Sequence, residues 1–160
     1  MTWADLAEEI AIELELMQVT IQELSDLAED AGDREPSIRD RTAAAAFLAQ
    51  FYNGVENILK RTSRFHGVPL PTGETWHAEL LKRFSAPGYA NLPILLDHEL
   101  LIKLSGYRKF RHVVHHGYGF QIEWSRLHEG ILHVSWVFQK LKDAAERFLK
   151  EARPQVEERM

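Results

Sequence analysis

The stretch "WADLAEEIAIELELMQVTIQELSDLA", residues 3–28, repeats apolar side chains at alternating steps of four and three residues. An α-helix makes one turn in about 3.6 residues, so this spacing gathers the apolar side chains on one face, as in coiled coils. The stripe comprises Trp3, Ala7, Ile10, Leu14, Met17, Ile21, Leu24 and Ala28. The chain is therefore predicted to begin with a long amphipathic helix that packs against other helices.

Segments that contain glycine and proline end this helix and divide the rest of the chain. The segment "AGDREP" at 31–36 separates it from a second helix, predicted over residues 37–64 and opened by Ser37. Apolar residues cover most of the circumference of this second helix, so it is either central in a bundle or packs on a partner chain as well. They include Ala45, Phe47, Leu48, Phe51, Tyr52, Val55, Ile58 and Leu59.

Two more helices are predicted in the middle of the chain. A short helix fits within "TGETWHAELLKRFS" at 72–85, with Thr72 or Thr75 as its cap. A longer helix is expected from about 98 to about 116, because Asp97 is a favourable N-cap and a glycine follows the last position.

The last helix begins near Glu123 and carries a second stripe at steps of three and four: Trp124, Leu127, Ile131, Val134, Phe138, Leu141, Ala145 and Phe148. No segment alternates like a half-buried strand, and no linker or internal repeat is visible. The predicted fold is all-α, an up-and-down bundle of four main helices plus one short helix. Residues 1–160 are expected to form a single domain, with a tail that frays after about residue 153.

The composition is that of an ordinary soluble domain, with 45% hydrophobic and 27% charged residues among 160. The chain has no cysteine, which excludes disulfides and thiolate chemistry. Its acidic, amphipathic N-terminus does not resemble a signal peptide. The longest nearly apolar run, "TAAAAFLAQFY" at 42–52, is too short to span a bilayer. We therefore expect a cytoplasmic protein without membrane contact.

The net charge of -5 is unevenly distributed along the chain. Residues 1–33 contain ten acidic residues and no Lys or Arg, whereas residues 101–116 contain four basic residues and no acid. These four are Lys103, Arg108, Lys109 and Arg111. A polyanionic ligand is consequently expected to be held locally and not attracted by the whole surface.

The stretch "YRKFRHVVHHGYGF", residues 107–120, combines basic and titratable side chains. His116 suits proton transfer, because histidine titrates near neutral pH, and Arg111 suits phosphate oxygens through its planar fork. Together they fit the attack of a ribose 2′-hydroxyl on its neighbouring phosphate, with His116 as general base or acid. The flanking phosphates are expected to contact Lys103, Arg108 and Lys109.

Other interpretations of this stretch stay open. A run of Arg and Lys is often a solvated helix end, and Val113 and Val114 indicate a buried face on which some histidines are simply packed. His112 has His115 three residues and His116 four residues further on, a spacing compatible with a shared metal ion, although the stretch has no carboxylate. Phosphate-loop, dinucleotide, zinc-finger and serine-nucleophile motifs are absent.

The segment "RHVVHHGY" resembles the R-x4-H-x-Y motif of the HEPN-domain ribonuclease toxins, with Arg111, His116 and Tyr118 at the three motif positions. Its surroundings are similar to the HepT-like branch of that superfamily over roughly residues 40 to 150. The similar segments are "FLAQFYNGVENILKRTS", "PTGETWHAELLKRFS" and "YRKFRHVVHHGYGFQIEWSRL". The motif alone is loose, and its place near the end of the penultimate helix makes it more specific.

This resemblance implies a helical bundle that dimerises, with the active cleft between two copies of the motif. It implies an endoribonuclease that works without metal or cofactor, with Arg111 and His116 as catalytic residues and RNA as substrate; no DNA partner is expected. It further implies a toxin whose antitoxin is a minimal, MntA-like nucleotidyltransferase, which silences it by adding AMP to Tyr118. His115 is predicted to contact RNA, and whether His115 or His116 transfers the proton stays open.

Two rival interpretations belong to other classes of protein. The chain is then either a non-catalytic helical module that binds a nucleotidyltransferase or RNA through the same basic patch, or a scaffold without a site. Loss of activity in His116→Ala with an intact fold indicates catalysis. Loss of affinity on removing the charges of Lys103, Arg108 and Lys109 indicates binding.

Overall fold

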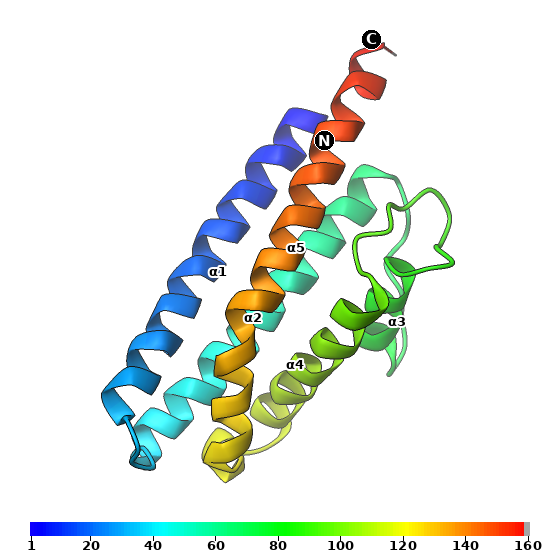
Figure 1. Cartoon of the computed structure of the whole chain (residues 1–160). Coiled ribbons are helices and arrows are strands. Elements are labelled where there is room, and N and C mark those ends of the chain that lie inside the picture. The colour runs from blue at the N-terminus through cyan, green and yellow to red at the C-terminus, as the bar shows by residue number, and fades with distance from the viewer. Residues whose placement is uncertain (159–160) are drawn as a thin grey trace.

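Five α-helices and one short 3₁₀ turn make up the computed structural model of the chain, which describes residues 1–158 and the side chains of residues 1–153 (Figure 1). The elements are α1 (Trp3–Ala31), α2 (Ile38–Phe65), α3 (Trp76–Arg83), α4 (His98–His116), η1 (Gly119–Gln121) and α5 (Trp124–Glu158). No β-strand occurs within residues 1–158. The all-α prediction is therefore confirmed, with η1 as an element that the sequence did not predict.

Capping side chains fix where three of the long helices begin. Thr2 Oγ1 accepts a hydrogen bond from the Asp5 amide, and the Asp5 carboxylate accepts one from the Thr2 amide, which forms a capping box for α1. Ser37 accepts from the Asp40 amide at the start of α2, and Asp97 accepts from Leu100 at the start of α4. The predicted caps of α2 and α4 are thus confirmed, whereas α3 starts after Thr75 without a side-chain cap.

Helix α2 is the central element, packed by α1, α4 and α5 (Figure 1). Its buried side chains face all of these neighbours, among them Leu48, Phe51, Val55 and Ile58. The apolar circumference of α2 is therefore satisfied within one chain. Of the two interpretations left open by the sequence, the central position is confirmed, and the composition of α2 no longer argues for a dimer.

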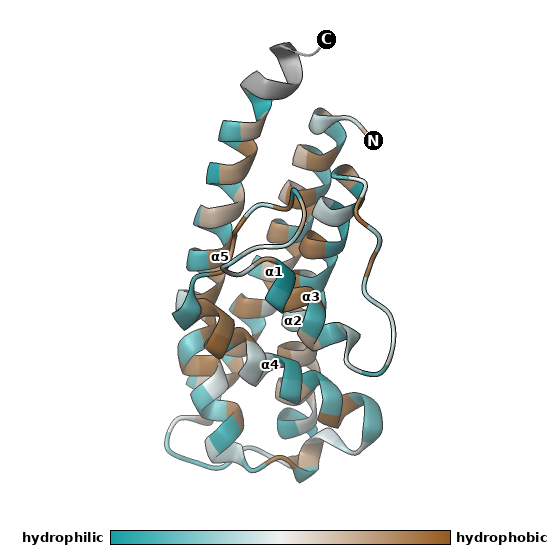
Figure 2. Ribbon diagram, turned by 90° about the vertical axis from the view of Figure 1, so that its right-hand side faces the viewer, coloured by the Kyte–Doolittle hydropathy of each residue, from teal (hydrophilic) through white to brown (hydrophobic). Residues whose placement is uncertain are grey.

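The two predicted stripes form the outer part of the core. Figure 2 shows hydrophobic and hydrophilic residues alternating along the long helices, as expected when one face is buried. In α1, the positions from Ile10 to Leu24 are buried at the predicted spacing, and Leu6 joins them. In α5, the buried positions from Leu127 to Ala145 also follow the prediction. Helices α1 and α5 pack against each other and against α2.

The connection between α2 and α4 places α3 beside the site described below. Leu80, Leu81 and Phe84 are buried, and they hold α3 against α2 and α4. The Phe84 carbonyl accepts hydrogen bonds from the amides of Leu95 and Leu96 at 3.0 and 3.1 Å, which ties the returning chain to the end of α3. The first turn of α3 is thereby fixed next to the C-terminal half of α4.

The turn between α4 and α5 lies directly on α2. Helix α4 ends at His116 with Gly117 as its C-cap, as predicted. A Cβ atom added at Gly119 would lie 2.8 Å from the Ala45 Cβ of α2, so only glycine permits this close approach. The turn also carries Tyr118, immediately before η1.

Two features of the chain as a whole complete the fold. No helix among the described residues combines the length and hydropathy needed to cross a membrane. Helix α5 is assigned up to Glu158, while residues 159 and 160 lie outside the described part of the chain. The fraying expected after about residue 153, like the assignment of residues 1–160 to a single domain, stays a prediction.

Candidate functional site

A pocket of about 460 Å³ lies between the start of α3 and the C-terminal half of α4. We call it the Arg111 pocket, and it is lined by Gly73, Glu74, Thr75, Trp76, His77, Ala78, Arg108, Arg111, His112 and His116. The predicted pair of Arg111 and His116 is therefore brought to one pocket, together with Arg108. The opposite wall comes from α3 and the loop before it.

The guanidinium of Arg111 is held by side chains from two other helices. Its Nε donates to Asn53 Oδ1 at 2.9 Å and lies 4.0 Å from Glu56 Oε1 in α2. Its Nη1 lies 3.3 Å from His77 Nε2 in α3. Within the described residues no hydrogen bond involves Nη2. Arg111 is thus oriented by α2 and α3 and keeps a donor edge for an anionic ligand.

His77 links Arg111 to a buried carboxylate. Glu56 is 2% exposed, and its Oε2 lies 2.6 Å from His77 Nδ1. Because arginine has only donors, His77 Nε2 must accept the hydrogen bond from Arg111. The proton of neutral His77 therefore sits on Nδ1 and is donated to Glu56, an assignment that rests on the hydrogen-bond network.

The negative charge of Glu56 is compensated inside the protein. Glu56 lies beside Arg111 and accepts from His77, which satisfies a carboxylate that would be costly to bury alone. Burial, with a further effect of the Glu56 charge, raises the pKa of Tyr52 far above its usual value. Tyr52 is therefore a neutral phenol at the base of this network.

Two histidines near the end of α4, His112 and His116, line the Arg111 pocket, and a third, His115, is affected by the Arg111 charge. The rings of His112 and His116 lie with their centroids 4.5 Å apart and are inclined by 41°. The charge of Arg111 is the main cause that lowers the pKa of His115, and partial burial, His116 and His77 contribute less. His115 thus experiences the guanidinium charge, while His116 is the one of these two that lines the Arg111 pocket.

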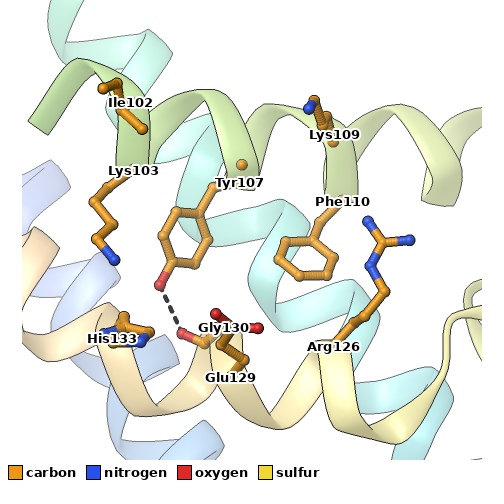
Figure 3. Close-up of a pocket in the computed structure, with 10 residues that line it drawn as sticks. Ile102, Lys103, Tyr107, Lys109, Phe110, Arg126, Glu129, Gly130 and His133 are labelled. Atoms are coloured by element: carbon orange, nitrogen blue, oxygen red, sulfur yellow. Dashed lines mark hydrogen bonds between the residues drawn. The ribbon is translucent and has the colours of Figure 1, made fainter. Parts of the chain in front are cut away.

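The other predicted RNA-binding lysines lie on a different side of α4. Lys103 and Lys109 line a second depression of about 270 Å³, here called the α4–α5 groove, together with Arg126 and His133 (Figure 3). Its remaining lining residues are Ile102, Gly106, Tyr107, Phe110, Glu129 and Gly130. No ion pair to Lys103 or Lys109 is found in the described part of the chain. The basic residues predicted as one patch are thus divided between the Arg111 pocket and this groove.

Tyr118 lies on the turn after α4, outside the lining of the Arg111 pocket. Its side chain is 67% exposed and stacks on Phe120, with ring centroids 5.6 Å apart. Two glycines, Gly117 and Gly119, flank Tyr118 in this turn. The phenol is therefore reachable by another protein without unfolding of the bundle.

Asn53, Glu56 and His77 were not predicted as site residues. Asn53 and Glu56 lie three residues apart in a mostly apolar segment of α2, and a polar pair on one face of a buried helix indicates a partner inside the protein. His77 had no comparable signal. It precedes Arg111 by 34 residues, and only the fold brings the two together.

Among the described residues, no three or more His, Asp or Glu side chains form a group that could hold a metal ion. The histidines of α4 are near one another, but no acidic side chain lines the pocket beside them except Glu74 from the opposite wall.

Comparison with known proteins places these features in a family. The family model described as HepT-like protein matches residues 43–152, which include most of α2, all of α3 and α4, the turn with η1, and most of α5. No curated protein and no solved structure matches the chain. The matched segment covers more than half of the sequence and contains every site residue described above. The chain therefore belongs to the HepT-like family of HEPN-type proteins.

Proposed function

We propose that the protein is a metal-independent endoribonuclease toxin of a toxin–antitoxin pair. One observation carries this proposal: His116 lines the same pocket as Arg111, whose guanidinium is fixed by Asn53 and His77. An oriented guanidinium beside an exposed imidazole is suited to the charge and proton movements of phosphodiester cleavage. Membership of the HepT-like family, which suggests a ribonuclease fold of the HEPN toxin type, supports it.

The proposed reaction is an internal transesterification of RNA. His116 accepts the proton of the 2′-hydroxyl as the O2′–P bond forms, and the P–O5′ bond breaks. The leaving O5′ receives a proton from a protonated imidazole. Arg111 donates to the non-bridging oxygens, where negative charge increases in the transition state. The products are a 2′,3′-cyclic phosphate and a 5′-hydroxyl.

A homodimer supplies a second imidazole and a second guanidinium at one cleft. Large apolar side chains remain exposed on α4 and α5 in the single chain: Ile102 is 57%, Leu132 66% and Trp136 38% exposed. Burying such side chains favours association, because each large apolar side chain contributes about 1.5–3 kcal/mol when fully removed from water. These residues support a dimer on grounds independent of α2.

The RNA strand is proposed to contact two surfaces on α4. Arg108 lies in the Arg111 pocket beside the scissile phosphate, and exposed His115 adds a nearby polar contact. Lys103 and Lys109 in the α4–α5 groove hold phosphates further along the strand. Figure 3 shows the Lys103 side chain directed toward His133 across this groove.

Tyr118 is the proposed site of regulation by an MntA-like nucleotidyltransferase. Its exposure makes the phenol a reachable nucleophile for the α-phosphorus of ATP, with pyrophosphate as leaving group. The attached AMP places a phosphate near the end of α4, where it competes for the Arg111 fork and obstructs the RNA. Inhibition then requires no change of fold.

A cleavage assay tests the proposed reaction. The purified protein is expected to cut a single-stranded RNA in EDTA and to leave intact an analogue that lacks the 2′-hydroxyl at the cut position. His116→Ala should abolish cleavage while its circular dichroism and dimerisation match wild type, and His115→Ala should cost less. Cleavage that requires a divalent ion, or that proceeds equally on the analogue, contradicts the proposal.

Mass spectrometry tests the proposed regulation. Incubation with the nucleotidyltransferase partner and ATP is expected to increase the mass by one AMP and to stop cleavage. Tyr118→Phe should remain unmodified and active. If the mass is unchanged, or if Tyr118→Phe is silenced as readily, the regulatory site lies elsewhere.

A non-catalytic binding module is the second candidate, and the separation of the α4–α5 groove from the Arg111 pocket favours it. A protein that only binds RNA or a nucleotidyltransferase loses affinity in the double variant Lys103→Gln, Lys109→Gln and tolerates His116→Ala. The exposed Lys150, outside both surfaces, provides the matched control Lys150→Gln.

A further inference from the structure

We propose that His77 is the positioning residue for Arg111: the imidazole transmits the orientation of buried Glu56 to the guanidinium that contacts the scissile phosphate. This inference rests on the proposed ribonuclease function and extends it from α4 to α3. It concerns a residue that no sequence motif of the chain identifies.

The contacts of His77 define a chain of three side chains from three helices. Glu56 in α2 accepts from His77 Nδ1 at 2.6 Å, and His77 Nε2 accepts from Arg111 Nη1 at 3.3 Å. Glu56 is almost completely buried, so its carboxylate is a fixed anchor. The His77 ring is also held from the side by Trp76, with ring centroids 3.5 Å apart. His77 therefore has little freedom to release or follow Arg111.

Both ring nitrogens of His77 are engaged, which distinguishes its role from that of His116. A general acid or base needs a nitrogen that reaches the substrate, and His77 has one nitrogen on Glu56 and the other on Arg111. Its side chain is 21% exposed, whereas His116 is exposed at the open side of the pocket. His77 consequently acts through Arg111 and not on the RNA.

The orientation of Arg111 depends on this acceptor. Asn53 holds Nε, and His77 holds Nη1, so the two contacts together fix the plane of the guanidinium. Asn53 and the more distant Glu56 carboxylate both lie at Nε, so without His77 the plane is free to rotate about that one nitrogen. A guanidinium shifted by roughly 1 Å from the phosphate loses on the order of 100-fold in rate.

The test is a double-mutant cycle on RNA cleavage under steady-state conditions, with RNA in excess over the protein. His77→Leu is expected to lower kcat by about 100-fold with a smaller change in KM, because the misplaced group acts mainly in the transition state. In the Arg111→Ala background, His77→Leu should change the residual rate by less than about twofold, since the residue it positions is gone. Independent, multiplicative effects overturn the proposal.

Two further variants separate positioning from folding. His77→Gln keeps an acceptor for Arg111, so we expect it to recover most of the rate lost in His77→Leu. His66 is a matched control, because it is also a half-buried histidine bonded within the protein, through Nδ1 to the Thr62 carbonyl. His66→Leu should leave kcat unchanged. If His77→Gln is as inactive as His77→Leu while both keep the wild-type fold, the acceptor role is wrong.

Nitrogen NMR of the imidazole provides a measurement that does not depend on cleavage. In ¹⁵N-labelled wild type at neutral pH, His77 is expected as the neutral tautomer with its proton on Nδ1. A tautomer protonated on Nε2, or an imidazolium, is incompatible with acceptance from Arg111 and overturns the proposal. If wild type cleaves no RNA, the ribonuclease function fails, and the tautomer alone then decides whether His77 orients Arg111.

Discussion

Replacing Gly119 by alanine is expected to destabilise the protein through a single contact. The added Cβ would lie 2.8 Å from Ala45 Cβ and 3.8 Å from Val114 Cγ2. Carbon atoms pack at about 3.5–4.0 Å, so η1 must move away from α2 by roughly 1 Å. Overpacking of this kind costs about 1–3 kcal/mol. For a chain of this length the melting temperature should fall by about 2–12 °C.

Gly106 in α4 is the matched control. No atom lies within 4 Å of a Cβ added at Gly106, so Gly106→Ala meets open space in the middle of a helix. The exchange removes backbone entropy from the unfolded chain and should stabilise the protein by about 0.5–1 kcal/mol. The two glycine-to-alanine exchanges are thus expected to change the free energy of unfolding in opposite directions.

Urea unfolding at one fixed protein concentration measures both variants, because the stability of the proposed dimer would depend on concentration. In an Ala45→Gly background, the destabilisation caused by Gly119→Ala should shrink to below about 0.5 kcal/mol, since the opposing methyl group is absent. Equal unfolding curves for wild type and Gly119→Ala, or the same loss in both backgrounds, refute the proposed contact.

The remaining predictions concern assembly, charge and the core. Sedimentation is expected to show a dimer at micromolar concentration, which Trp136→Glu weakens by placing a charge at the exposed apolar surface; a monomeric wild type contradicts this. The pKa of His115 should lie below its usual value of about 6.5 and should rise in Arg111→Gln, as followed by NMR titration. Protonation of His115 opposes folding, because the unfolded chain binds this proton more tightly. The resulting loss of stability is therefore absent above about pH 6.5 and grows as the pH falls through the lowered pKa. Tyr107→Phe should lower the free energy of unfolding by about 0.5–1.5 kcal/mol, because the buried phenol donates to the Gly130 carbonyl at 2.6 Å.

The fold was largely predictable because local sequence patterns indicate each of its long helices. The apolar stripes of α1 and α5 follow the period of an α-helix, which depends only on the sequence of that helix. Ser37 and Asp97 mark the starts of α2 and α4, because each side chain accepts a hydrogen bond from an amide only three residues further on. The sequence alone could not decide between the two positions left open for α2, for a physical reason. Apolar residues all around a helix indicate that the helix is buried. They do not indicate whether the residues that cover it belong to the same chain or to a partner.

The site was predictable only where it follows one helix. Arg111 and His116 lie on α4 at a spacing that a motif can record. Lys109 is two residues from Arg111 in the sequence. Two residues correspond to about 200° around a helix, so Lys109 lies on the opposite face of α4 from Arg111. Asn53 and His77 reach Arg111 from 58 and 34 residues away, and such contacts follow from the packing of α2 and α3 and not from any local pattern.

The packing of α4 against α5 has a consequence for synthesis on the ribosome. Tyr107 and Phe110 are almost completely buried, and a Cβ at Gly130 would lie 3.1 Å from the Phe110 ring, so the motif-bearing helix depends on the last one. Translation of the 35 residues of α5 takes about 2–7 s at 5–20 residues per second. Until α5 has been synthesised and packed, the nascent chain carries the complete motif of Arg111, His116 and Tyr118, but α4 lacks its contacts with α5. A premature stop codon before Gly130 is therefore expected to yield a chain in which Tyr107 and Phe110 of α4 lack their packing partner on α5.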